Sequence, residues 1–360
     1  MKKIIINLLL MLSAVFLCFA LIEICLRAFY PQIVECKINE HWRMKDDVLP
    51  YVPKPCYKGR MFLKGQFDVC LTTNNKGFRG AKDVDIERPR NITRVVFLGD
   101  SFVFGWGVDD DKVFTYTLEE RFNKEEDVEV INASVYGYDM DEYLVAFDRI
   151  FKYDPNVIFL GFCLENDFNF SISEKGSMSE ELRAEREDTG SHIREIINNL
   201  HIITLIRDRL YITFPKIRNI MLSLGINNKR DIFLKSYPES LNKLLVKTES
   251  ALDHMNKVSK ENGIDFIVLL IPLKEQIYCR QAISKFQDYD IDKPNEVLTD
   301  ILKRNSIQYI DLTSDLLTQS RLVKERLYFD TDPHWTEYGH EIVGQIIYNK
   351  YKDAIIKKGK

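Results

Sequence analysis

A serine follows an apolar segment in the stretch RVVFLGDSFVFGWG, residues 94–107. The β-branched and aromatic run predicts a buried strand, so Ser101 would lie at the strand's carboxyl end. Far along the chain, Asp332-Pro333-His334 places an imidazole two residues from a carboxylate. A serine hydroxyl becomes a nucleophile when an imidazole accepts its proton, and a carboxylate can fix the tautomer of that imidazole. These residue types together indicate nucleophilic chemistry on an acyl group.

A Gly-Asp-Ser sequence taken alone is usually a turn or a helix cap. The distant Asp332 and His334 favour a nucleophile instead, provided that the fold brings them to Ser101. In open α/β sheets, ligands bind at the carboxyl ends of the strands, because helix N-termini there present free N–H groups.

The elements that would position these residues form a regular alternation. Strand-like runs cover residues 94–98, 128–131, 156–161, 265–271 and 307–310. Helical patterns cover residues 113–123, 140–152, 241–260, 296–303 and 337–351. Strands that are apolar on both faces and alternate with amphipathic helices imply a parallel sheet covered on both sides. The sequence therefore predicts an α/β fold, a three-layer α/β/α sandwich.

Four segments would meet at the carboxyl edge of this sheet. They are Gly99-Asp100-Ser101, EVINASVYG at 129–137, GFCLEND at 161–167, and Asp332-Pro333-His334. This set of blocks, in this order, resembles the SGNH (GDSL-like) hydrolase family over about residues 94–351. The resemblance implies a flavodoxin-like parallel sheet and a serine esterase or O-acyltransferase that uses no cofactor.

The resemblance also implies roles for single residues. Ser101 corresponds to the nucleophile, His334 to the general base and Asp332 to the group that orients it. The N–H groups of Ser101 and Gly137 and the side chain of Asn166 correspond to the oxyanion hole. Each such donor can contribute about 3 kcal/mol to the transition state. Gly137 suits this role because a residue without Cβ lets its N–H approach the ligand closely.

The chain departs from the family pattern at one position of the third block, which usually reads Gly-x-Asn-Asp. Leu164 occupies the glycine position, so the backbone of this loop or the width of the pocket would differ. The Gly-x-Ser-x-Gly elbow of α/β-hydrolases is absent, which argues against that superfamily. Four further segments resemble sequence motifs of membrane-anchored members of the family: Gly77-Phe78-Arg79, residues 271–275, His334-Trp335-Thr336 and Gly339-His340.

The N-terminus indicates a membrane. Lys2 and Lys3 precede an apolar run at residues 4–22, which is just long enough to span a hydrocarbon core. The positive-inside rule then predicts a single-pass anchor, residues 1–26, with the domain on the extracytoplasmic side. A cleavable signal peptide is the alternative, although its best small-residue site, at residues 18–20, is poor.

We expect an N-terminal extension at residues 27–92 and a catalytic domain at 93–353. The extension either packs along the flank of the domain or serves as a tether. The alternation stops at about residues 168–237, where we expect a helical insertion. Because this insertion leaves from the carboxyl end of the third strand, it would form a lid or a substrate wall. Its charged run at 180–188 is typical of a solvated helix.

Composition excludes some partners. The 360 residues carry a net charge of −4, with no bulk basic character that would indicate nucleic acid. Seven cysteines are present, and none has the CxxC spacing or histidine partner of a metal site. Cys56 with Cys70 is the most plausible local disulfide. His254 and His340 are expected to be structural or exposed rather than catalytic. The oligomeric state is left open.

The sequence favours a membrane-anchored esterase or acyltransferase acting on O-acetyl groups of cell-envelope carbohydrate. Its partners would be an acylated carbohydrate or small ester and the membrane. Water as acceptor gives hydrolysis, whereas a sugar hydroxyl gives transfer. Two alternatives stay open: a non-catalytic polysaccharide-binding or assembly component of the same fold, and a lipid esterase.

Overall fold

The computed structural model describes residues 2–29, 40–63, 66–164, 167–168, 200–202, 205–206, 229–330 and 332–358. The chain divides into two compact units. One comprises residues 1–37 and 178–227, and the other comprises residues 38–177 and 228–360. Most of the insertion expected at 168–237, with its charged run, lies outside the described residues.

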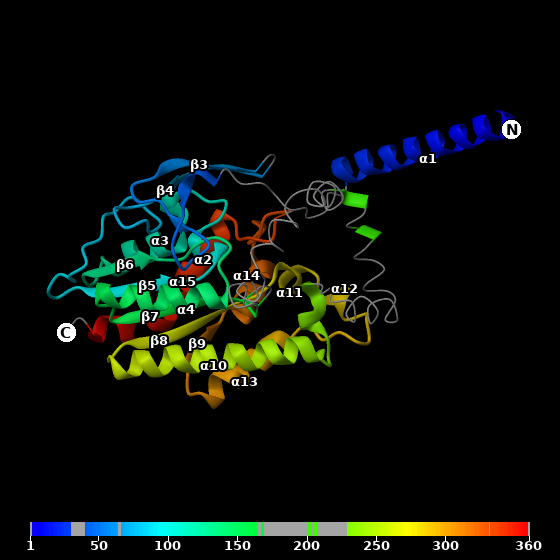
Figure 1. The fold of residues 1–360 in the computed structure, drawn as a ribbon. Coiled ribbons are helices and arrows are strands. Elements are labelled where there is room, and N and C mark those ends of the chain that lie inside the picture. The colour runs from blue at the N-terminus through cyan, green and yellow to red at the C-terminus, as the bar shows by residue number, and fades with distance from the viewer. Residues whose placement is uncertain are drawn as a thin grey trace. The chain divides into compact units, whose positions relative to one another are not determined.

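The larger unit is built on a five-stranded parallel sheet (Figure 1). Its strands are β5 (Thr93–Leu98), β6 (Val128–Asn132), β7 (Val157–Cys163), β8 (Asp265–Ile271) and β9 (Gln308–Asp311). Their spatial order is β6-β5-β7-β8-β9, so the chain starts near the middle and winds outward in both directions. This is the doubly wound order of flavodoxin-like sheets. The predicted parallel α/β architecture is confirmed.

Helices cover both faces of this sheet. On one face α3 (Phe114–Phe122) and α15 (Glu337–Lys358) pack against each other and against β6 and β5. On the other face, α4 (Met140–Ile150), α10 (Glu239–Glu261) and α13 (Lys293–Arg304) pack against β5, β8 and β9, respectively (Figure 1). The three predicted layers are therefore present.

Shorter elements connect these layers. They are α2 (Ser101–Phe104), η2 (Asp110–Lys112), η3 (Phe151–Tyr153), η4 (Lys229–Phe233), α11 (Lys274–Tyr278), α12 (Arg280–Ile283) and α14 (Thr313–Leu322).

The middle of the sheet is fully buried. Every residue of β5 and β7 is buried, and the rings of Phe97 and Phe159 stack with centroids 4.7 Å apart. Apolar residues on both faces of these strands pack against the helices above and below, which is why their sequences are continuous apolar runs. The central strands are thereby held at fixed depth in the core, and so are the loops that leave them.

The part of the extension from residue 40 onward packs as short antiparallel pieces. These are η1 (Glu40–Trp42), β1 (Arg43–Met44), β2 (Val52–Pro53), β3 (Lys58–Leu63) and β4 (Phe67–Thr72). β1 pairs with β2, and β3 pairs with β4. Their packing against the sheet domain is described with the site below.

The expected Cys56–Cys70 disulfide is wrong, since both thiols are free. In the β3–β4 ladder Cys70 lies opposite Arg60 and Thr72 lies opposite Lys58. Cys56 precedes the ladder and donates its N–H to Asn74 O at 2.8 Å. The two cysteines are therefore several residues out of register and cannot form a bridge.

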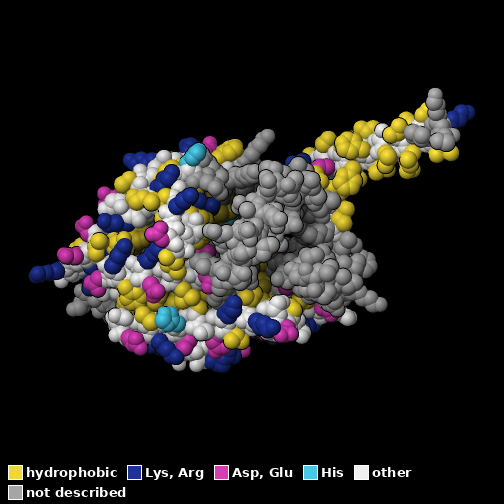
Figure 2. All heavy atoms as spheres, in the orientation of Figure 1, with side chains coloured by type: hydrophobic (Ala, Val, Ile, Leu, Met, Phe, Trp, Pro, Cys, Tyr) yellow, Lys and Arg dark blue, Asp and Glu magenta, His cyan; other side chains and the backbone are white. Residues whose placement is uncertain are grey.

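The N-terminal helix α1 (Lys2–Phe29) belongs to the other unit. Its segment Ile6–Phe29 has a mean hydropathy of 2.7 and is 6% buried. Apolar side chains cover the helix along its length (Figure 2). The helix is long and apolar enough to cross a membrane, and a signal sequence would pass the same test.

Arg94 at the start of β5 provides a test of the fold. Its side chain is fully buried and its Nε lies 2.6 Å from Glu129 Oε2 on β6. Because removing one partner leaves the other charge buried, we expect Arg94→Met to lower the free energy of unfolding by about 3–5 kcal/mol. Urea unfolding at pH 7 measures this loss.

The control is Arg304→Met. Arg304 pairs with Glu249 at 2.9 Å with 60% of its side chain exposed, and exposed pairs contribute at most about 1 kcal/mol. Equal losses of unfolding free energy in the two variants would contradict a stabilising role for the buried Arg94–Glu129 pair.

Candidate active site

Ser101 is placed by a sharp turn at the end of β5. Gly99 has φ +153°, and a Cβ there would come within 2.5 Å of a Val103 methyl group and 3.1 Å of Gly161 O. Asp100 then caps α2, since its carboxylate accepts the N–H of Phe102 at 2.9 Å. Ser101 is the first residue of α2, so its own N–H needs no acceptor within the helix.

A tight loop brings the second group of candidates. Tyr328 pairs with Trp335 in an antiparallel bridge, and Phe329 N–H donates to His334 O at 3.0 Å. Asp332 and His334 are therefore held near the tip of this loop. Lys274, at the start of α11, donates from Nζ to Phe329 O at 2.5 Å and to Asp330 O at 2.6 Å.

The structure brings Ser101, Asp332 and His334 together. His334 Nε2 lies 2.6 Å from Ser101 Oγ, and His334 Nδ1 lies 2.6 Å from Asp332 Oδ1. Asp332 Oδ1 also accepts the backbone N–H of His334 at 2.9 Å. An imidazole with its two nitrogens engaged in this way can accept a proton at Nε2 while a carboxylate steadies Nδ1–H. The arrangement can activate the serine hydroxyl.

Two further residues hold Asp332. Trp106 donates its indole N–H to Asp332 Oδ2 at 3.3 Å, and Asp332 donates its own N–H to Gln66 Oε1 at 3.0 Å. Burial alone would raise the pKa of Asp332. Attraction to His334 and the hydrogen bonds from His334 and Trp106 outweigh burial and lower that pKa below its usual value. The carboxylate is therefore ionised at neutral pH.

The aromatic residues after the nucleophile pack in the core. Phe102, Phe104 and Trp106 are all buried. The Phe102 ring lies 4.8 Å from the His334 ring and 5.0 Å from the Trp335 ring. These contacts limit the orientations that the imidazole can adopt. All three side chains thus pack in the core, and Trp106 also holds Asp332 through its indole N–H.

The candidate oxyanion donors follow from the loop after β6. Ala133 N–H donates to Phe97 O at 2.9 Å and Val135 N–H donates to Gly99 O at 3.0 Å, so this loop continues alongside β5 toward Ser101. Gly137 is exposed with φ +79°. Within the described residues its N–H has no acceptor. Asn166, the third donor expected, lies outside the described residues.

Leu164, which occupies the family's glycine position in the third block, is fully buried, so its side chain belongs to the core. Its N–H donates to Ile271 O at 3.2 Å. Asp167 accepts from Tyr143 Oη at 3.0 Å and from Cys163 N–H at 2.6 Å. Burial, together with the Asp100 charge, raises the pKa of Asp167 well above its usual value. Asp167 is a structural group beneath the turn.

The other histidines have separate places. His254 is exposed on α10, whereas His340 is buried on α15. His340 stacks on Phe114 with centroids 5.9 Å apart, and its Nδ1 accepts the Phe114 N–H at 3.4 Å. In the part of the chain that the structure describes, no group of three or more His, Cys, Asp or Glu could hold a metal ion.

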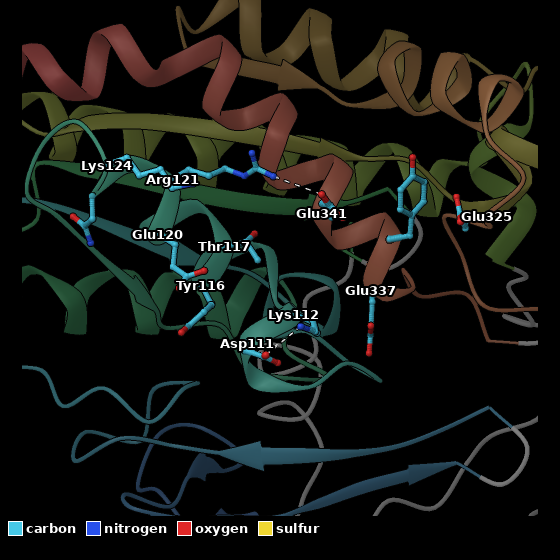
Figure 3. Close-up of a pocket in the computed structure, with 12 residues that line it drawn as sticks. Asp111, Lys112, Tyr116, Thr117, Glu120, Arg121, Lys124, Glu325, Glu337 and Glu341 are labelled. Carbon is cyan, nitrogen blue, oxygen red and sulfur yellow. Dashed lines mark hydrogen bonds and ion pairs between the residues drawn. The ribbon is translucent and has the colours of Figure 1, made fainter.

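A separate hollow of about 1120 Å³ lies over η2, α3 and the start of α15 (Figure 3). Its lining is mixed in charge and includes Glu120, Glu337 and Lys124. Neither Ser101 nor Asp332 nor His334 lines it. The hollow is therefore distinct from the candidate active site.

Sequence reasoning missed Gln66, since its role is to accept a backbone N–H from a distant loop. The ammonium group of Lys274 likewise binds two backbone carbonyls of the loop that carries His334.

A known protein family matches part of this chain. The family model described as the SGNH hydrolase-like domain of the acetyltransferase AlgX matches residues 235–358, the part that contains Asp332 and His334. This match covers the C-terminal part of the chain, and the α/β fold resembles that of SGNH hydrolases. A search of curated protein sequences gave no match.

Solved structures of similar fold include several esterases. An acetylxylan esterase from Geobacillus stearothermophilus shares 11% identity, with 72% of this chain and 93% of that chain covered and a TM-score of 0.41. A psychrotrophic esterase from a Pseudoalteromonas species shares 12%, with 73% and 98% covered and a TM-score of 0.39. A lipolytic G-D-S-L family protein from Veillonella parvula shares 12%, with 72% and 98% covered and a TM-score of 0.39.

The packing around His340 yields a pH prediction. Burial, aided by the charges of Arg79 and His334, lowers the pKa of His340 from 6.5 to about 3. Between these two pH values the unfolded chain binds one more proton than the folded chain. The free energy of unfolding is therefore not reduced by His340 above pH 6.5, and it falls as the pH is lowered from 6.5 toward 3. We expect the wild type to lose about 1.4 kcal/mol more per pH unit than His340→Asn.

Urea unfolding from pH 7 to pH 4 measures both slopes. His254→Asn, at an exposed position on α10, serves as the control for replacing a histidine by asparagine. Parallel slopes for the wild type and His340→Asn would show that His340 is not held neutral by burial.

Proposed function

We propose that this protein is a serine esterase or O-acyltransferase in which Ser101, His334 and Asp332 act as nucleophile, general base and orienting carboxylate. The observation that carries the proposal is the pair of 2.6 Å contacts that link Ser101 Oγ to His334 and His334 to Asp332. An ionised Asp332 stabilises the imidazolium that forms when His334 takes the serine proton.

The reaction has two steps. Ser101 Oγ attacks the ester carbonyl carbon while its proton passes to His334 Nε2, and the bond to the leaving alcohol breaks as His334 returns that proton to the alcohol oxygen. An acyl-enzyme results. His334 then deprotonates water or a sugar hydroxyl, whose oxygen attacks the acyl carbon; the bond from that carbon to Ser101 Oγ breaks, and His334 returns the proton to Ser101 Oγ. The N–H groups of Ser101 and Gly137, with the side chain of Asn166, would bind the negative oxygen.

The acetyl group is the favoured acyl group, because the matching family model is described as the domain of an acetyltransferase. We propose O-acetylated carbohydrate of the cell envelope as substrate. The apolar α1 supports an envelope location, with α1 as a retained anchor and the domain on the extracytoplasmic side. Sequencing the mature N-terminus tests this part, since a chain that starts after Ala20 would mean secretion.

Ser101→Ala tests the chemistry. We expect the turnover of p-nitrophenyl acetate by the full-length chain in detergent to fall roughly 10⁴-fold or more, since the proposed acyl-enzyme forms on Ser101 Oγ. Ser314→Ala, at an exposed position on α14, is the matched control and should turn over normally. Wild-type turnover by a folded Ser101→Ala protein would remove Ser101 from the mechanism.

The substrate class needs a separate experiment. The full-length protein is incubated with acetylated envelope glycans, and mass spectrometry follows released acetate and acetyl transfer together. We expect one or both products with the wild type and neither with Ser101→Ala. A wild-type protein that binds the glycan but turns over no ester at all would favour the binding-component alternative.

A further inference from the structure

The N-terminal extension makes a direct contact with the loop that carries Gly137. Tyr51 donates its phenol hydroxyl to the backbone carbonyl of Tyr136. In return, Tyr138 donates its hydroxyl to the backbone carbonyl of Tyr51 at 2.5 Å. Two hydrogen bonds therefore cross the contact in opposite directions, and they involve the residues on either side of Gly137. The extension is attached to this loop at the position of a candidate oxyanion donor.

The peptide that Tyr51 binds is the one whose N–H belongs to Gly137. The C=O of Tyr136 and the N–H of Gly137 share one trans peptide plane and point in opposite directions. Fixing the carbonyl therefore fixes the N–H, which must point away from Tyr51. Gly137 has φ +79°, and a Cβ there would lie 2.7 Å from Tyr51 Oη. The close approach of the phenol requires glycine at this position.

Tyr51 is itself held by neighbours from the extension. The guanidinium of Arg43 lies 3.9 Å from the centroid of its ring, and the Trp42 ring meets it edge-on at 6.1 Å. Trp42 in turn stacks on Phe104 of α2, with centroids 5.3 Å apart. The hydroxyl of Tyr51 is thus placed relative to the same short helix that begins with Ser101.

We infer that Tyr51 is a positioning residue that orients the Gly137 N–H toward the oxyanion. This inference rests on the proposed function. An oxyanion donor must be aimed at the place where charge develops, and its bond strengthens only in the transition state. A residue that fixes the donor's direction should therefore affect kcat and leave KM nearly unchanged.

Tyr51→Phe tests the inference, because it removes the hydroxyl and keeps the ring. Losing one oxyanion donor outright costs about 10²–10³ in kcat, and losing only its orientation should cost part of that. We expect kcat for p-nitrophenyl acetate to fall about tenfold with KM changed less than about twofold. The full-length protein is used, and its unfolding midpoint in urea is measured alongside.

The matched control is Tyr237→Phe. Tyr237 also donates its hydroxyl to a backbone carbonyl, but its acceptor is the nearby Ile232 O at 2.6 Å and not the Tyr136–Gly137 peptide. Any loss from removing the hydroxyl of a half-buried tyrosine appears in both variants as lower stability. Only Tyr51→Phe should lower kcat.

A double-mutant cycle with Gly137→Ala measures the coupling between the two substitutions in kcat. A purely structural role of Tyr51 would give no such coupling. Both changes act on one peptide group, so the double variant should lose less in kcat than the product of the two single losses. The affinity for phenylboronic acid, which forms a tetrahedral adduct on a serine, should fall in parallel with kcat.

Unchanged kcat in a folded Tyr51→Phe protein, with Ser101→Ala inactive, would overturn the positioning role and leave the proposed function intact. An independent, multiplicative loss in the double variant would overturn it too. Activity that survives in Ser101→Ala would instead show that the proposed function is wrong.

Discussion

The hydrogen bond between Ser101 Oγ and His334 Nε2 joins two residues that are 233 positions apart. A doubly wound sheet brings these two residues together. Ser101 follows β5 near the middle of the sheet, and the loop with His334 follows β9 and α14 much later in the chain. The close turn at Gly99 and the Lys274 contacts to two loop carbonyls fix the two sides of the bond. Without either, the imidazole would not meet the serine.

The N-terminal extension completes the site instead of merely linking it to α1. Its side chains reach three different parts: Gln66 accepts the Asp332 N–H, the Phe67 ring lies 5.3 Å from that of Trp106, and Tyr51 binds the Tyr136 carbonyl. Trp106 in turn donates to the Asp332 carboxylate. Asp332 and the loop that carries Gly137 therefore both depend on residues of the extension. Of the two roles left open for the extension, packing on the flank applies to the described part.

The sheet was predictable because buried parallel strands are continuous apolar runs, and β8 begins and ends at the predicted residues. β7 extends two residues further than predicted, since its apolar run continues to Cys163. Ser101, Asp332 and His334 could be named because their chemistry needs particular residue types. The supports could not, because Gln66 and Lys274 bind backbone groups, which leave no mark on the sequence. The Cys56–Cys70 error has the same origin, since proximity along the chain does not give strand register.

The central claim is that Ser101 is made nucleophilic by His334, and covalent labelling tests it most directly. The full-length protein is treated with diisopropyl fluorophosphate, which reacts with activated serines, and the modified peptide is identified by mass spectrometry. We predict one adduct, on Ser101, formed rapidly in the wild type and lost in His334→Ala. An adduct on a different serine, or equal labelling of Ser101 without His334, would contradict the account.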